Sequence, residues 1–217
     1  MNSLSQFEPL FLDFIHAEMT QDLAHDINHV LRVVASAKAL CVQEQALPQV
    51  VIPAAFLHDC FSFEKNHPNK SQSSVVAADK AIQFLKQINY PSEYHDGIHH
   101  AIVAHSFSAN VTPRTLEAKI VQDADRLDAL GAIGIARCLQ VSVKLDRPLY
   151  YAEDPFCQQR TPNDGEYTID HFYTKLFLLA ERMNTQSAKV EATKRTDFMR
   201  EYLMQLNHEI HYNNPLK

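Results

Sequence analysis

Apolar residues recur every three or four positions along most of this chain, which is the spacing that gives a helix one hydrophobic face. Alternation of polar and apolar residues, which indicates strands, is scarce. The pattern therefore predicts an all-α protein. The expected helices cover residues 6–19, 27–40, 50–59, 71–88, 92–105, 113–139, 168–184 and 187–208.

Local signals refine the bounds of three of these helices. Asp22 or Asp26 can cap the second helix, because an aspartate before the first turn accepts a backbone N–H. Pro53 is expected in the first turn of the helix over 50–59, where proline is tolerated. In the long helix after Thr112 and Pro113, glycines allow close packing or a kink at positions 131 and 134.

Residues 141–167 lack this periodicity and contain three prolines and an Asn-Asp-Gly turn. A loop of this length in a compact domain is usually functional or mobile. The loop separates a core over residues 1–140 from the remainder, residues 141–217, in which two C-terminal helices follow the loop. We expect the two parts to pack together as one structural unit.

Composition narrows the possible functions. The net charge of −6 and a pI near 6.0 argue against a nucleic acid polymer or an anionic membrane as partner. No stretch of about 18 apolar residues is present, and the N-terminus lacks the basic start of a signal peptide. The four cysteines form no CxxC pair, which is typical of reduced thiols in a cytoplasmic protein.

Candidate chemistry is concentrated where histidines adjoin aspartates. His58 and Asp59 end the very apolar helix over 50–59, and burying both there without compensation costs several kcal/mol. A divalent cation is one compensation, although the pair alone also fits a helix-terminal cap beside a histidine. His25 and His29 lie four positions apart and share a helix face.

Three aspartates, Asp123, Asp125 and Asp128, interrupt an otherwise apolar helix. Buried carboxylates are rare unless they are paired, so each must face water or meet a partner. The ordered series of histidine, histidine-aspartate and aspartate is a mixed nitrogen and oxygen ligand set. Such a set suits Mn²⁺, Fe²⁺, Co²⁺ or Mg²⁺ better than a thiolate-rich zinc site.

These motifs resemble the HD superfamily of metal-dependent phosphohydrolases, and most closely its bacterial YedJ-like subgroup. The likeness is carried by AHDINHVLRV, HDCFSFEKNHPNKSQSS, AIVAHSFSANVTPRTLEAKIVQDADRLDALGAIGIAR and DHFYTKLFLLAERMNTQSAK, which together extend from about residue 20 to residue 205. The resemblance implies an HD-domain helical bundle with a C-terminal helical extension.

The resemblance also implies one divalent metal ion, with Mn²⁺ or Mg²⁺ preferred and Fe²⁺, Co²⁺ or Ni²⁺ as alternatives. Its ligands would be His29, His58, Asp59 and Asp125. Asp123 is kept as the alternative last ligand, because it points roughly 200° away from Asp125 around an α-helix and both cannot readily bind one ion. Whether a second metal binds stays open.

Further residues are candidates for the reaction or for substrate binding. Lys65 and Arg126 can neutralise phosphate charge, and His105 can orient the attacking water or bind phosphate. His25 is either a support or substrate contact or an ordinary helix-start histidine. The remaining candidates for substrate binding or support of the ligands are Glu64, Asn66, His171 and Lys175.

The expected reaction is hydrolysis of a phosphate ester or phosphoanhydride by metal-activated water. The resemblance implies a small phosphorylated substrate, namely a nucleotide, and a monomer or homodimer. Two other hypotheses stay open: a di-iron oxygenase on the HD fold, and a non-catalytic helical module that binds a nucleotide.

Overall fold

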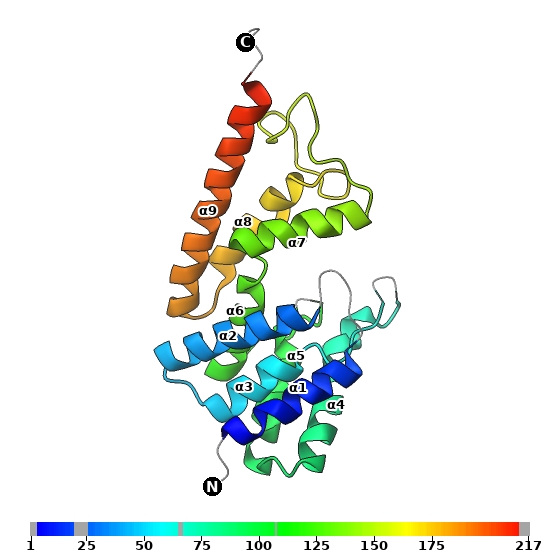
Figure 1. Ribbon diagram of the computed structural model, residues 1–217, viewed down its shortest axis with the longest axis vertical. Coiled ribbons are helices and arrows are strands. Elements are labelled where there is room, and N and C mark those ends of the chain that lie inside the picture. Colours follow the sequence, from blue (N-terminus) through cyan, green and yellow to red (C-terminus); the bar gives the residue numbers. More distant parts are fainter. Residues whose placement is uncertain (1–3, 20–25, 65–66, 107, 213–217) are drawn as a thin grey trace. The chain divides into compact units, whose positions relative to one another are not determined.

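The computed structural model describes residues 4–19, 26–64, 67–106 and 108–212 (Figure 1). In these ranges the regular elements are helices, and no strand occurs, as the hydrophobic pattern predicted. The chain divides into two compact units, of which the first comprises Met1–Leu127 with Asn184–Ala188 and the second Asp128–Met183 with Lys189–Lys217. This division comes earlier in the chain than the boundary expected at residue 140.

The first unit is a bundle around one central helix. Helix α3 (Pro48–Leu57) is buried continuously from Val50 to Leu57, in agreement with its almost wholly apolar sequence. It packs against its neighbours α1, α2, α5 and α6. The other helices of this unit are α1 (Glu8–Glu18), α2 (Ile27–Gln43), α4 (Ser73–Gln87), α5 (His95–His105) and α6 (Leu116–Leu127).

Pro53 lies inside α3, so its expected place in the first turn was wrong; Pro48 begins the helix instead. A proline inside a helix cannot donate to the carbonyl four residues before it. In this chain that carbonyl belongs to Gln49, and it accepts a hydrogen bond from the Tyr90 hydroxyl at 2.7 Å. A buried side chain from elsewhere in the bundle thus replaces the missing helical hydrogen bond.

The second unit begins where the sequence predicted the middle of one long helix, and that prediction was wrong. Helix α6 ends at Leu127 and α7 (Gly131–Lys144) starts at Gly131. Gly131 has φ +72°, and a Cβ atom there would lie 3.2 Å from Cγ of Arg195. The left-handed backbone and the close neighbour both favour glycine and end the continuous helix.

Of the two predicted C-terminal helices, the first is present in part and the second in full. The segment expected over 168–184 forms a π-helix, η4 (Phe172–Leu176), then α8 (Phe177–Leu179) and a 3-10 turn, η5 (Ala180–Arg182). The last helix, α9 (Gln186–His211), matches the one expected over 187–208.

The long loop between α7 and η4 has internal structure of its own. The Arg160 guanidinium donates to both oxygens of Asp170, at 2.5 and 2.7 Å. The rings of Tyr151 and Tyr167 lie 5.3 and 5.1 Å from the Arg160 guanidinium carbon. Asp170 is fully buried, so this pair forms a small polar core for the loop.

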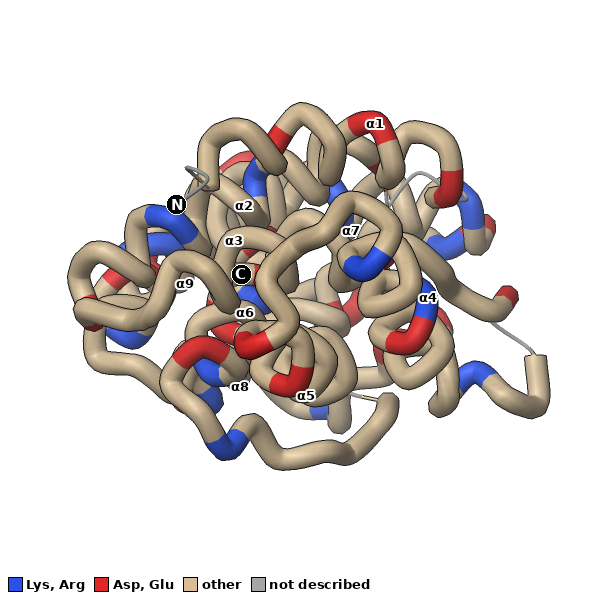
Figure 2. Tube along the Cα trace, turned by 90° about the horizontal axis from the view of Figure 1, so that it is seen from below, with Lys and Arg blue, Asp and Glu red and all other residues tan. Residues whose placement is uncertain are grey.

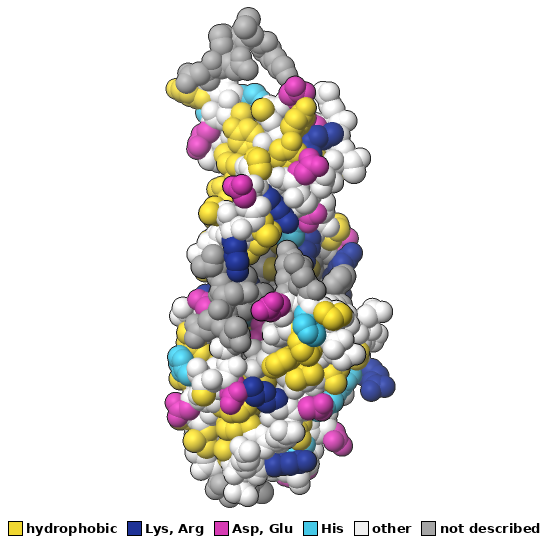
Figure 3. Space-filling model, turned by 90° about the vertical axis from the view of Figure 1, so that its right-hand side faces the viewer, with side chains coloured by type: hydrophobic (Ala, Val, Ile, Leu, Met, Phe, Trp, Pro, Cys, Tyr) yellow, Lys and Arg dark blue, Asp and Glu magenta, His cyan; other side chains and the backbone are white. Residues whose placement is uncertain are grey.

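The surface carries both signs of charge. Lysine and arginine are interspersed with aspartate and glutamate along the traced chain (Figure 2). The face drawn in Figure 3 shows acidic and basic side chains among hydrophobic and neutral groups. Among the described helices, none combines the length and the apolar character that a membrane crossing requires.

Candidate metal centre

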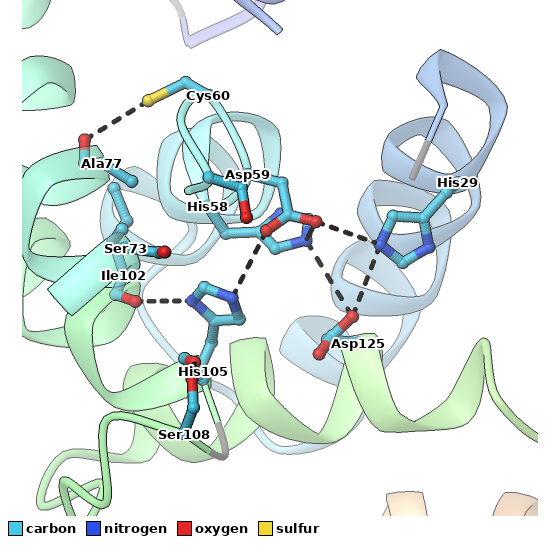
Figure 4. Close-up of polar contacts among 12 residues, drawn as sticks. His29, His58, Asp59, Cys60, Ser73, Ala77, Ile102, His105, Ser108 and Asp125 are labelled. Atoms are coloured by element: carbon cyan, nitrogen blue, oxygen red, sulfur yellow. Dashed lines mark hydrogen bonds and ion pairs between the residues drawn. The ribbon is translucent and has the colours of Figure 1, made fainter. Parts of the chain in front are cut away.

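Three helices of the first unit bring four of the predicted residues to one place (Figure 4). His29 belongs to α2, His58 and Asp59 directly follow α3, and Asp125 lies in the last turn of α6. The Nε2 atom of His29 lies 3.4 Å from Oδ1 of Asp125 and 3.7 Å from Oδ2 of Asp59. The Nε2 atom of His58 lies 3.6 Å from the same Asp59 oxygen and 4.0 Å from Oδ1 of Asp125.

Local structure fixes where these side chains start. Asp26 is the N-cap of α2, and its carboxylate accepts the His29 backbone N–H at 2.8 Å. Of the two expected caps Asp26 is therefore confirmed, whereas Asp22 lies outside the described residues. His29 sits in the first turn and is 1% exposed. The buried helix α3 ends at Leu57, so His58 and Asp59 emerge from the hydrophobic core.

The His58 ring is oriented by a backbone carbonyl. Its Nδ1 lies 2.8 Å from the Ala55 carbonyl oxygen, which can only accept, so Nδ1 carries the hydrogen. Burial lowers the pKa of His58 and favours the neutral ring, which leaves a lone pair on Nε2. This Nε2 is buried without a hydrogen-bond partner in the described part of the chain. A buried lone pair that faces carboxylate oxygens, and meets no donor in the described part of the chain, is an arrangement that a bound cation would satisfy.

His105, at the end of α5, flanks the same group on the other side of Asp59. Its Nδ1 lies 2.6 Å from the Ile102 carbonyl, and its Nε2 lies 3.6 Å from Oδ1 of Asp59. Burial alone would lower the pKa of His105, but the neighbouring Asp59 carboxylate outweighs burial and raises it. The two oxygens of Asp59 thus face different histidines (Figure 4).

Two overlapping sets of side chains have the spacing of metal ligands. One comprises His29, His58 and Asp125, and the other His58, Asp59 and His105. Both sets need the Nε2 lone pair of His58, which can bind only one cation at a time. The imidazole and carboxylate donors are groups that could hold a divalent metal ion.

Asp123, the alternative last ligand, faces a different part of the first unit. Its carboxylate accepts the backbone N–H groups of Asn184 and Thr185, the Asn184 amide and the Thr185 hydroxyl, all at 2.8–3.1 Å. Thr185 stands just before α9, whose first turn it caps through the Ala188 N–H at 3.4 Å. Asp123 therefore anchors the start of α9, and Asp125 alone of the two approaches His29 and His58.

The other predicted residues are distributed more widely. Arg126 is part-buried next to Asp125, and Glu64 is exposed after the histidine-aspartate pair. His171, which bonds Asp164 at 2.8 Å, and Lys175 belong to the second unit. His25, Lys65 and Asn66 lie outside the described residues.

Sequence reasoning missed two residues that organise this region. Gln122 donates to the Ala104 carbonyl at 2.7 Å, next to His105, and accepts from the Asn184 amide at 2.9 Å. Lys70 holds the loop after Asp59. Two sequence signals were available for Lys70: its place in the segment HDCFSFEKNHPNKSQSS and the preceding Pro68-Asn69 turn, which returns the chain toward that loop.

Comparison with known proteins identifies relatives along almost the whole chain. The HD domain family model matches residues 26–130. The uncharacterized protein YpgQ of Bacillus subtilis strain 168 is 31% identical over 215 residues, which are 97% of this chain and 96% of that protein.

Solved structures give the same result for the fold. An HD-superfamily hydrolase from Bacillus thuringiensis superposes with a TM-score of 0.74 at 30% identity, covering 95% of this chain and 98% of its own. Bacillus subtilis YpgQ in complex with ADP superposes with a TM-score of 0.72 at 28% identity, covering 98% and 97%. The narrower YedJ-like assignment stays a prediction.

Proposed function

This chain belongs to the HD superfamily of hydrolases, and from that premise we propose that it is a metal-dependent phosphohydrolase acting on a nucleotide. One observation carries the proposal. The oriented Nε2 lone pair of His58 is buried within 4.0 Å of carboxylate oxygens from Asp59 and Asp125. A bound cation would stabilise such a set, because the set brings acceptor atoms together without a donor between them.

We assign His29, His58, Asp59 and Asp125 as ligands of one divalent cation, with Mn²⁺ or Mg²⁺ preferred. A bound divalent cation polarises a phosphoryl group and lowers the pKa of water. The chain itself orients the ligands, through the Ala55 carbonyl for His58 and the Asp26 cap for the turn that carries His29.

The residues around these ligands have separate proposed roles. His105 is proposed to exchange a proton with the attacking water at Nε2, which lies 3.6 Å from Oδ1 of Asp59, while the other Asp59 oxygen lies near His29 and His58. Lys65 and Arg126 are proposed to neutralise phosphate charge. The binding of ADP by YpgQ supports a nucleotide as the substrate. Substrate contacts by His25, Glu64, Asn66, His171 and Lys175 remain predictions.

The test is a hydrolysis screen of nucleoside mono-, di- and triphosphates. The protein is treated with a chelator, and Mn²⁺, Mg²⁺, Co²⁺ or Ni²⁺ is then added back. We expect wild-type turnover that depends on added metal, and no turnover by Asp59→Ala with any of the metals, while its helical circular dichroism stays near wild type. The matched control is Asp79→Ala, because Asp79 is 64% exposed on α4 of the same unit.

Three outcomes would contradict this function. Turnover by Asp59→Ala at the wild-type rate would remove Asp59 from the mechanism. Full activity after chelation would show that the reaction does not require a metal ion. Two irons per chain with oxygen-dependent turnover would favour the oxygenase hypothesis instead.

A further inference from the structure

The loop that follows Asp59 is closed by one lysine. The Lys70 ammonium donates to the Ser62 hydroxyl at 2.6 Å and to the Phe63 carbonyl at 2.7 Å. The Phe63 N–H in turn donates to the Ser73 hydroxyl at 3.1 Å, and this hydroxyl donates to the Lys70 carbonyl at 2.8 Å. These bonds hold the Lys70 head group at a fixed place in the loop.

Ring contacts reinforce the same loop. His67 stacks on Phe63 with ring centroids 4.3 Å apart and an interplanar angle of 7°. The Asn69 N–H donates to Nδ1 of His67 at 3.1 Å, which fixes the ring. Phe61 meets Phe63 edge-on at 4.8 Å. The position of the Lys70 ammonium is thus set before any ligand arrives, which reduces the entropy lost on binding.

The charge of Lys70 has no carboxylate partner among the described residues, because both oxygens that it contacts are neutral. Two other lysines of the first unit do have a carboxylate partner: Lys38 bonds Glu8 at 2.6 Å, and Lys80 bonds Glu18. An ammonium has three N–H donors, so Lys70 retains one donor and an uncompensated positive charge. That combination matches a phosphate oxygen.

The Lys70 ammonium bonds the loop that begins directly after Asp59 of the candidate metal centre. Ser62 follows Asp59 by three positions, so their Cα atoms are at most about 11 Å apart. Ser73, which anchors the other end of the loop, is drawn with the centre in Figure 4. A substrate with more than one phosphate group, bound at the centre, is the kind of ligand that could also reach this loop.

We propose that Lys70 is a substrate-binding residue whose remaining N–H donates to a phosphate oxygen. The role in turnover rests on the proposed function, but the binding of a phosphate anion does not. The assignment adds a cation that the sequence did not single out, beside the predicted Lys65 and Arg126.

The first experiment measures the binding of inorganic phosphate to chelator-treated, full-length protein by calorimetry at low ionic strength. We expect Lys70→Met to weaken phosphate binding about tenfold or more, which corresponds to roughly 1.4 kcal/mol. Lys80→Met is the matched control, since it removes a lysine of the same unit that is paired with Glu18, and it should bind phosphate like wild type. Equal binding by Lys70→Met and wild type, or an equal loss in both variants, would overturn the proposal.

The variant Ser62→Ala tests whether Lys70 acts through its positive charge or only by holding the loop in place. It removes one acceptor that holds the ammonium but keeps the positive charge. If Lys70 binds phosphate, Ser62→Ala should lose clearly less affinity than Lys70→Met. If the two variants lose the same affinity, Lys70 acts only by shaping the loop and the proposal fails.

Kinetics then test the role in turnover. We expect Lys70→Met to raise KM at least about tenfold while kcat changes less than about threefold, because uniform binding is lost. The KM of wild type should also rise with ionic strength more steeply than that of the variant. Phosphate binding that depends on Lys70 in a protein without hydrolase activity would refute the proposed function and leave the Lys70 site intact. An unchanged KM would refute the role of Lys70 in turnover.

Discussion

Two polar clusters of this protein differ in whether the chain supplies hydrogen-bond donors to their acceptor atoms. In the second unit, Asp170 is fully buried and accepts from the Arg160 guanidinium and from the Asn163 N–H at 2.6 Å. Donors from the chain itself satisfy that carboxylate. In the first unit, the His58 lone pair faces the carboxylates of Asp59 and Asp125 instead. The comparison indicates that a structural cluster contains its own hydrogen-bond donors, whereas the candidate metal centre contains acceptors that the chain leaves without donors.

The same contrast occurs within one helix. Asp123 and Asp125 are two positions apart on α6, and both interrupt its apolar pattern. Asp123 is saturated by donors from Asn184 and Thr185, whereas Asp125 lies beside His29. Asp123 therefore resembles Asp170 in its chemistry, and Asp125 belongs to the candidate metal centre.

The largest effect on stability should come from the saturated cluster. We expect Asp170→Asn to lower the free energy of unfolding by about 3–5 kcal/mol, because it breaks a buried ion pair and leaves Arg160 without its carboxylate. Urea unfolding measures the change. The exposed Asp197 pairs with Arg200 at 3.0 Å, and the control Asp197→Asn should change stability by no more than about 1 kcal/mol.

This effect should also depend on pH. Burial alone would raise the pKa of Asp170, but Arg160 and the Asn163 N–H outweigh it and lower the pKa. A depressed pKa in the folded state stabilises the fold above the unfolded value of about 3.9, and this stabilisation is lost as pH falls through the folded value. The gap between wild type and Asp170→Asn should therefore narrow in acid. A gap that is constant from neutral pH to pH ~2 would contradict the ion pair.

An intermediate effect on stability is expected when a metal ion binds at the candidate metal centre. Addition of Mn²⁺ at about one hundred times its dissociation constant should stabilise wild type by roughly 2.7 kcal/mol, since the ion binds only the folded state. Asp125→Asn should show much less stabilisation at the same concentration. Thermal unfolding with and without the ion gives the measurement, and equal stabilisation of both proteins would exclude Asp125 as a ligand.

The smallest effect should be that of Asp125→Asn without metal. The Asp125 side chain is 30% exposed and, unlike Asp123, accepts no hydrogen bond from a backbone N–H of the described residues. Its loss should therefore change the unfolding free energy by about 0.5 kcal/mol or less. Chelated protein in urea tests this expectation. A loss as large as that of Asp170→Asn would show that Asp125 has a structural role and would remove the contrast between the two clusters.

Tertiary contacts explain why several sequence predictions failed or stayed open. An isolated glycine is compatible with a helix, so only the left-handed Gly131 and its Arg195 neighbour reveal the break between α6 and α7. Pro53 is tolerated inside α3 because Tyr90, far along the chain, bonds the Gln49 carbonyl. The loop over 141–167 gave no periodic signal, because the bonds between Arg160 and Asp170 that order it depend on folding back.

The sequence by itself determined the helical class, the central place of α3 and the residue types of the candidate metal centre. Those features follow from local periodicity and from the cost of burying histidine and aspartate. Only the tertiary structure decided which aspartate faces His29, which carbonyls orient His58 and His105, and where the Lys70 ammonium is held. Each of these features depends on a partner from another part of the chain, which a repeating pattern does not encode. The pattern gives the direction of a side chain on its own helix, but only the packing of the helices decides which group that side chain contacts.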